Sequence, residues 1–233
     1  MPVDGHPDDA LVHYAVQRAQ RMLANVMQLA DLADGWVGSM DLVRARDRQA
    51  RMALFESDIS HVLHWDSDVL PEDLRIIDRM LETGHDCVGA PYRRKKQKEE
   101  YPWRPLDVAG HVVNGCLEVR GLAFGFMLTS RAFLEQMWNG YLSTRWYFDV
   151  AQQASGKSRA HLTVSMFDLC YTEVAEAPDG QPFRVKLSED YSFCESYRAI
   201  GGKVHMFVAE GAPVGHMGTA VYRGTREGLA GAG

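Results

Sequence analysis

An apolar segment from Ile59 to Trp65 runs directly into two carboxylates, Asp66 and Asp68, and this junction constrains the fold more than any other feature. Its β-branched and aromatic residues predict a buried strand over Ile59–Asp68. Residues i and i+2 of an extended chain point to one side, so both carboxylates would face one small volume. Open α/β sheets bind ligands at the carboxyl ends of strands, and a divalent cation would relieve the repulsion between the two acids. The same Asp-Ser-Asp sequence is equally typical of a turn that caps a following helix.

Helical and extended patterns alternate along the rest of the chain. Apolar spacing, caps and glycine stops predict five helices and several short strands. We expect helices over residues 9–33, 39–57, 71–84, 130–138 and 188–201, and strands over 86–90, 112–113, 116–119 and 203–208. This order indicates a sheet with crossover helices. Without an internal repeat or a linker, one domain over residues 1–223 is the simplest account, followed by a flexible glycine- and alanine-rich tail over 224–233.

Composition narrows the class of protein. The 233 residues are 46% hydrophobic and 24% charged, which is ordinary for a globular protein with a real core. No apolar run reaches membrane-spanning length, and the first five residues do not form a signal peptide. We therefore expect a soluble, cytoplasmic protein without a membrane partner. The net charge of −6 argues against a surface devoted to nucleic acid.

A basic run follows the predicted second strand and could act against that overall charge. It is either a solvated loop or a patch that grips the phosphates of DNA. Its charged members are Arg93, Arg94, Lys95, Lys96 and Lys98.

Four short motifs, in their order and spacing, resemble those of the GT-A class of nucleotide-sugar glycosyltransferases. They are Asp-Ser-Asp at 66–68, Ala-Phe-Gly-Phe-Met-Leu at 123–128, Ser-Glu-Asp-Tyr-Ser-Phe at 188–193 and His-Met-Gly at 216–218. Ala-Arg-Asp at 45–47 also resembles an Ala-Arg-Asn found in many members. The resemblance covers residues 5–222 and implies a single Rossmann-like α/β domain with a mixed, mostly parallel central sheet flanked by helices.

The resemblance also implies a metal site. Asp68 would bind Mn²⁺ or Mg²⁺ directly, His216 would be a late ligand, and Asp66 would contact the metal through water or the ribose of the donor. Such a cation neutralises the charge that develops on a nucleoside-diphosphate leaving group. The alternative for His216 is a loop histidine with no ligand.

Two acids at the start of a predicted helix would carry the chemistry. By resemblance, Asp190 is the general base that deprotonates the acceptor hydroxyl, and Glu189 is its neighbour at the acceptor, or the two roles are exchanged. Both could instead be simple partners of the helix dipole.

Three more residues would bind the donor. Arg46 would contact the nucleotide or its phosphates, although Asp47 departs from the usual asparagine beside it. Tyr92 would shape the sugar pocket, and Gly125 would allow the backbone to approach a ligand.

The activity that the resemblance implies is that of a hexosyltransferase-like, inverting enzyme whose acceptor is a glycan, a small molecule or a hydroxylated base in DNA. By comparison with the family, we expect the strand that opens this fold and holds the nucleobase to be missing or reduced in this sequence, which leaves the base of the donor open. The alternatives are a metal-dependent phosphoester hydrolase and a non-catalytic module that binds sugar nucleotides or carbohydrate.

Overall fold

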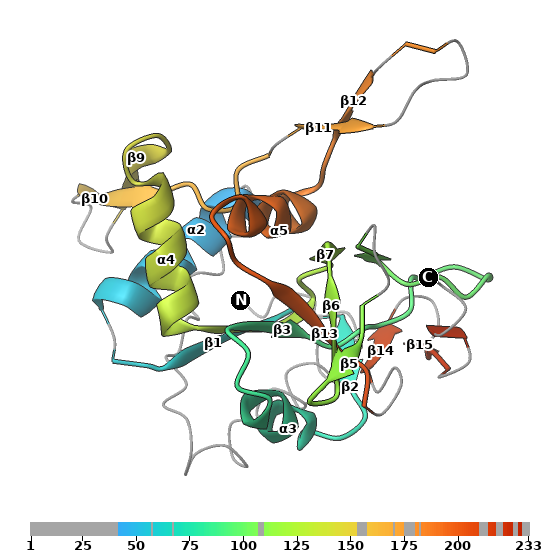
Figure 1. Cartoon of the computed structure of the whole chain (residues 1–233). Helices are drawn as coiled ribbons and strands as arrows, with labels where there is room; N and C mark the ends of the chain where they lie inside the picture. The colour runs from blue at the N-terminus through green and yellow to red at the C-terminus, as the bar shows by residue number, and fades with distance from the viewer. Residues whose placement is uncertain are drawn as a thin grey trace, which may run out of the picture. The chain divides into compact units, whose positions relative to one another are not determined.

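The computed structural model describes residues 42–56, 58–66, 68–106, 110–152, 158–169, 171–174, 180–181, 183–209, 214–217, 221–225 and 228–229 (Figure 1). The helix expected over 9–33 lies outside them, and so do residues 1–5, where the opening strand of the family was expected to be missing or reduced. The described residues divide into two compact units. Unit 1 contains the stretches 61–130 and 203–229, and unit 2 contains 42–60 and 131–202.

A six-stranded sheet forms the centre of unit 1, in the order β1-β8-β3-β13-β6-β5. The strands are β1 (His61–Trp65), β3 (Cys87–Gly89), β5 (Val112–Val113), β6 (Cys116–Val119), β8 (Phe126–Ser130) and β13 (Val204–Phe207). Among these neighbours only β3 and β13 are parallel, and every other pair is antiparallel. The prediction of a mixed sheet is confirmed, but the prediction that it is mostly parallel is wrong.

The sheet is not mostly parallel because one strand is inserted between two others. The order β1, helix, β3 is typical of a parallel crossover unit. In the structure β8 lies between β1 and β3 and pairs antiparallel with both. Sequence reasoning also left the antiparallel pairing of β5 with β6 unassigned. These strands are joined by Asn114 and Gly115, both at positive φ, as a two-residue hairpin requires.

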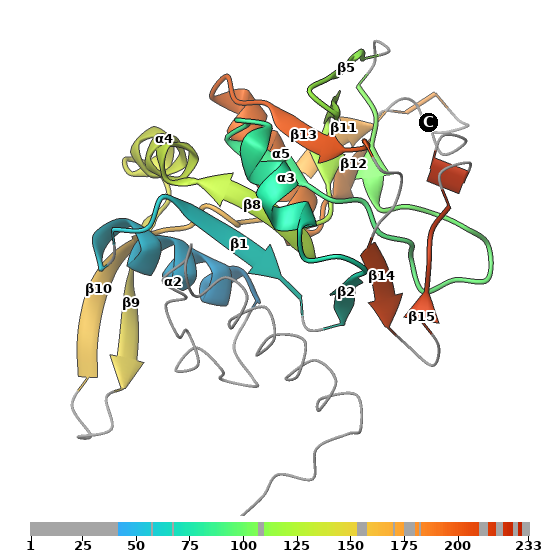
Figure 2. The same ribbon diagram turned by 90° about the horizontal axis from the view of Figure 1, so that it is seen from below.

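Helix α3 (Ile76–Glu82) covers one face of this sheet (Figures 1 and 2). Its side chains Ile76, Ile77 and Met80 are fully buried in one core with residues of β3 and β8. The helix was expected to start at Pro71, which is wrong. Pro71 ends β2 (Val69–Pro71), where it pairs with Val214, and the helix begins only after a turn.

Strand β2 joins a second, three-stranded sheet in the order β15-β14-β2. Strand β14 (Val214–Met217) lies between β2 and β15 (Val221–Tyr222) and runs antiparallel to each of them. The register sets His216 opposite Val69, one residue after Asp68. A separate two-stranded pair in unit 1 joins β4 (Trp103–Arg104) and β7 (Gly121–Leu122).

Two described residues of the expected flexible tail, Thr225 and Leu229, make contacts within unit 1. The backbone N–H of Thr225 donates to Glu99 Oε1 at 2.6 Å, and Tyr101 Oη donates to the carbonyl of Thr225 at 3.0 Å. The side chain of Leu229 is buried. Flexibility of the segment as a whole stays a prediction.

The described residues of unit 2 form three helices and two hairpins. They are α2 (Leu42–Phe55), α4 (Arg131–Tyr141) and α5 (Glu189–Ala199), β9 (Trp146–Gln152) with β10 (Ser158–Val164), and β11 (Tyr171–Val174) with β12 (Phe183–Lys186). Its core is aromatic: the rings of Phe167 and Phe193 stack with centroids 4.1 Å apart, and Phe133 packs on Phe193. None of the helices in the described stretches has the length and apolarity to cross a membrane.

Candidate functional site

The acids after β1 lie on a turn. Pairing of β1 with β8 ends at Trp65, and the backbone N–H of Val69 then donates to the carbonyl of Asp66 at 3.0 Å. The indole N–H of Trp65 donates to the carbonyl of Val69 at 2.7 Å and braces the turn. The strand therefore stops before both carboxylates, and the expectation that an extended chain carries Asp66 and Asp68 on one side is wrong.

Asp68 instead meets His216 through the second sheet. His216 Nε2 lies 3.4 Å from Asp68 Oδ2. On the other side of the ring, Nδ1 lies 3.0 Å from the backbone carbonyl oxygen of Arg93. A carbonyl oxygen can only accept, so Nδ1 carries the hydrogen. Nε2 is therefore the nitrogen that faces the carboxylate, and in a neutral ring its lone pair is available to bind a metal there, as in metal-binding histidines oriented by a backbone acceptor.

Tyr92 and Gly125 adjoin this pair. The ring of Tyr92, nearly buried, presents its edge to His216 with centroids 5.0 Å apart. A Cβ on Gly125 would lie 2.6 Å from Tyr92 Oη, so only glycine leaves room for the phenol. The carbonyl of Gly125 also accepts from the backbone N–H of Asp66 at 2.9 Å. The structure thus brings Asp66, Asp68, Tyr92, Gly125 and His216 into one part of unit 1.

The Asp68–His216 pair fits two positions in the coordination sphere of a divalent cation. Two ligand atoms that are each about 2.1 Å from one ion lie ~3 Å apart when they are adjacent in an octahedron. The observed separation of 3.4 Å is close to that value. In the part of the chain that the structure describes, no three His, Cys, Asp or Glu side chains converge on a common point. Asp66 as a third ligand therefore stays a prediction.

Lys95 is the residue that sequence reasoning missed at this position. Its ammonium forms an ion pair with Asp68 Oδ2, the same oxygen that faces His216. Hydrogen bonding from His216 and then from Lys95, against partial burial, lowers the pKa of Asp68 to about 2. The carboxylate is therefore charged at every physiological pH. The signal in the sequence was the basic run, which was interpreted as solvent-exposed or DNA-binding.

The predicted catalytic acids lie in unit 2, at the start of α5. Glu189 Oε1 accepts from Arg46 Nη1 at 2.9 Å. Arg46 is 5% exposed and lies over the ring of Phe167, with its guanidinium carbon 5.9 Å from the ring centroid. Asp190 Oδ1 accepts from the hydroxyl of Ser188 and from the backbone N–H of Tyr191. Arg46 and Glu189 thus form a pair, and Asp190 adjoins it in a partly exposed position.

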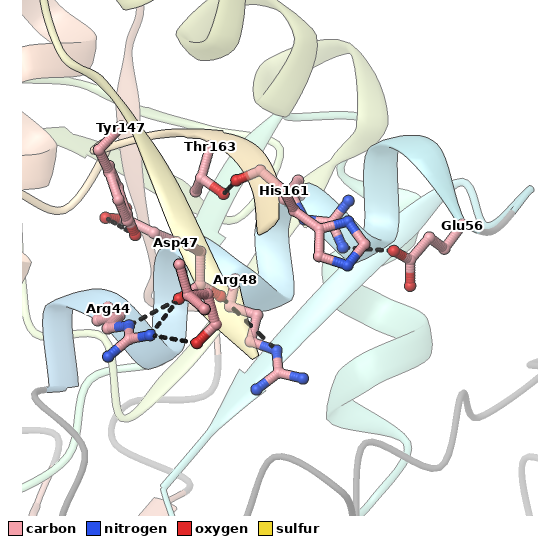
Figure 3. Close-up of polar contacts among 10 residues, drawn as sticks. Arg44, Asp47, Arg48, Glu56, Tyr147, His161 and Thr163 are labelled. Atoms are coloured by element: carbon pink, nitrogen blue, oxygen red, sulfur yellow. Dashed lines mark hydrogen bonds and ion pairs between the residues drawn. The ribbon is translucent and has the colours of Figure 1, made fainter. Parts of the chain in front are cut away.

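Asp47, the residue after Arg46, is a buried acid that joins separate elements of unit 2. The Asp47 carboxylate is fully buried and accepts four hydrogen bonds, from the backbone N–H groups of Met166 and Phe167 and from the hydroxyls of Ser165 and Tyr147. Figure 3 shows Asp47 and Tyr147. Burial raises the pKa of Asp47 to about 6, against the hydrogen bonds, which lower it. This carboxylate ties α2 to the end of β10 and the turn that follows. The sequence showed Asp47 only as a departure from asparagine, because its partners lie about 100 or more residues away.

Arg44 adds a second tie between α2 and the β9–β10 hairpin. Its Nε donates to Asp149 Oδ1 at 2.7 Å, and its Nη2 donates to the carbonyl of Val150 at 3.0 Å (Figure 3). Asp149 is 2% exposed. The arginines of α2 therefore serve two purposes, since Arg44 fixes the hairpin and Arg46 meets the acids of α5.

Comparison with known proteins gives a distant structural likeness. No family model matches the chain, and no curated protein matches it. The crystal structure of A197 from STIV is similar to it with a TM-score of 0.42 and 17% sequence identity, over 76% of this chain and 68% of that one.

Proposed function

We propose that this protein is a metal-dependent glycosyltransferase that moves a sugar from a nucleoside-diphosphate sugar to an acceptor hydroxyl. The observation that carries the proposal is the pairing of Asp68 with His216, in which a backbone carbonyl orients the imidazole so that its second nitrogen faces the carboxylate. The resemblance of the four sequence motifs supplies the reaction class, and two of those motifs contribute this pair.

In this proposal Asp68 and His216 hold Mn²⁺ or Mg²⁺. The bound ion would neutralise the charge of the departing diphosphate. Asp66 is a further ligand or binds the donor ribose, and Tyr92 and Gly125 shape the wall beside the sugar. Tyr92 suits that position because its ring is fixed between Gly125 and His216.

The chemical step needs a base at the acceptor. In the proposal the acceptor oxygen forms a bond to the anomeric carbon, the bond from that carbon to the diphosphate breaks with its electron pair leaving on phosphate, and the hydroxyl proton goes to the Asp190 carboxylate. This displacement inverts the sugar. We assign the base to Asp190 because Glu189 is held by the Arg46 guanidinium.

The acceptor in this proposal is a glycan, a small molecule or a hydroxylated base in DNA. The structure offers limited support for DNA. The ammonium of Lys95 is paired with Asp68 and that of Lys96 with Glu100, so these charges already have partners within the protein.

A thermal-shift screen tests the proposal. Nucleoside-diphosphate sugars that differ in base and sugar are compared with and without Mn²⁺. A donor at a hundredfold over its Kd stabilises the folded protein by about 2.7 kcal/mol, a shift of several degrees. We expect one donor to stabilise the protein only with the metal. Metal-dependent release of phosphate from a simple ester, with no response to any sugar nucleotide, would instead establish the hydrolase.

A further inference from the structure

The basic loop after β3 is folded into a defined shape beside the candidate cation site. The backbone N–H of Arg94 donates to the carbonyl of Glu100 at 2.8 Å, and that of Lys96 donates to the carbonyl of Arg94 at 2.8 Å. The guanidinium of Arg93 donates to the carbonyls of Lys96 and Gln97. The loop thus closes on itself and holds the intervening Lys95 in place.

The basic side chains of this loop have different partners. Lys96 pairs with Glu100 at 2.7 Å, and the charges of Lys98 and Arg94 also act on Glu100. The Arg93 side chain bonds to backbone carbonyls of the loop and of Arg223. Lys95 differs, because its ammonium contacts Asp68.

Asp68 Oδ2 faces two nitrogen groups, the ammonium of Lys95 and, at 3.4 Å, His216 Nε2. An ammonium satisfies the carboxylate before a divalent ion binds, and a divalent ion would replace it because both bind the same oxygen. The displaced ammonium would remain tethered beside the ion by its loop, where a bound phosphate would be its nearest new anion.

We propose that Lys95 is a phosphate-binding residue of the donor site, which pairs with Asp68 until a divalent ion binds there and then binds the diphosphate of the donor. The nature of the ligand rests on the proposed function. Lysine suits this role because its flexible stem lets one point charge serve two anions in turn.

Isothermal titration calorimetry of Lys95→Gln tests the proposal, with inorganic pyrophosphate and Mn²⁺ as probes. Losing a charged partner on phosphate should weaken pyrophosphate binding in Mn²⁺ by about tenfold or more. Affinity for Mn²⁺ alone should rise by about threefold or more, because no ammonium competes for Asp68. Lys96→Gln removes a charge from the same loop and should change neither affinity. Lys95→Arg should recover most of the pyrophosphate affinity.

Unchanged affinities in Lys95→Gln would overturn the proposal, and so would an equal loss in Lys96→Gln, which would indicate a general charge effect. A wild-type protein that binds Mn²⁺ but no pyrophosphate would also overturn it. Failure of the proposed function looks different: pyrophosphate binding would depend on Lys95 while no sugar nucleotide binds or reacts. Sugar transfer with full rate and donor affinity in Lys95→Gln would overturn only the role of Lys95.

Discussion

Protonation of the buried Asp47 carboxyl group stabilises the folded protein, which is the less common direction for an acid. Its pKa of about 6 in the folded protein lies above the ordinary 3.8, chiefly because of burial. The folded state therefore binds more protons than the unfolded state between these values. The stabilisation is complete below pH 3.8 and is lost as the pH rises through 6. At 1.36 kcal/mol per pKa unit, the shift corresponds to roughly 3 kcal/mol at most.

We predict that Asp47→Asn stabilises the protein at pH 7.5 and flattens the dependence of stability on pH between 4 and 6. The amide oxygen can accept from Met166 and Phe167, and the amide nitrogen can donate to the hydroxyl oxygens of Ser165 and Tyr147. Urea unfolding at several pH values measures the effect. Asp78→Asn, on the exposed face of α3, is the control. A destabilised variant at pH 7.5 would show that the charge itself is needed.

At this scale the sequence predicted residues better than it predicted their partners. Asp68, His216, Tyr92 and Gly125 were named as site residues and do lie together, because each belongs to a short motif that carries local chemistry. Lys95 was grouped with its basic neighbours, since charge in a loop does not reveal which acid it will meet. Only the pairing of β14 with β2 and the return of the loop bring that acid within reach.

At the scale of elements, His205 of β13 and His85 of the segment before β3 form a pair of half-buried imidazoles. The rings of His85 and His205 stack at 3.7 Å with an angle of 9° between their planes. Burial, followed by the charge of His85, lowers the pKa of His205 to about 4. The unfolded chain then binds more protons than the folded one as the pH falls from 6.5. This element therefore loses stability on acidification, opposite to Asp47.

We predict that His205→Phe reduces the loss of stability between pH 6.5 and 4, because the phenyl ring keeps the stack with His85 but does not titrate. Thermal unfolding across this pH range provides the measurement. The matched control is His111→Gln, since His111 is exposed. An identical slope in the wild type and in His205→Phe would exclude the stacked pair as a source of the acid sensitivity.

The elements themselves were largely predicted, with one systematic error. Helices near 39–57, 130–138 and 188–201 and strands near 86–90 and 203–208 have counterparts in α2, α4, α5, β3 and β13. The direction of pairing was wrong because an apolar run shows that a strand is buried but not which neighbour it meets. The insertion of β8 between β1 and β3 is a long-range event. The early end of β1 has a similar cause, since its pairing with β8 sets its length.

At the scale of the whole molecule, the predicted residues divide between the two units. The candidate cation ligands and the donor wall belong to unit 1, whereas Arg46, Glu189 and Asp190 belong to unit 2. The proposed function therefore assigns cation and diphosphate binding to one unit and proton removal to the other.

We predict that the two tasks separate by mutation. Asp68→Ala should abolish Mn²⁺-dependent donor binding, whereas Asp190→Asn should bind the donor normally and lose transfer by about a hundredfold or more, as expected for a general base. Calorimetry measures donor binding, and release of the nucleoside diphosphate measures turnover. Glu189→Gln controls for charge at the same helix start. Full transfer by Asp68→Ala with a chelator present would refute the metal role, and full transfer by Asp190→Asn would refute the base.

The group that orients His216 has a consequence for how this protein can change over time. The acceptor for Nδ1 is the main-chain oxygen of Arg93, not a side chain. Any amino acid at position 93 supplies the same oxygen, so the tautomer of the imidazole depends on the path of the main chain, which the Arg93 side chain helps to hold through the carbonyls of Lys96 and Gln97. The orientation of His216 is therefore sensitive to insertions and deletions between β3 and β4, which would move the oxygen itself. The length of this loop, together with the bonds of Arg93 that fix its path, is what selection would preserve.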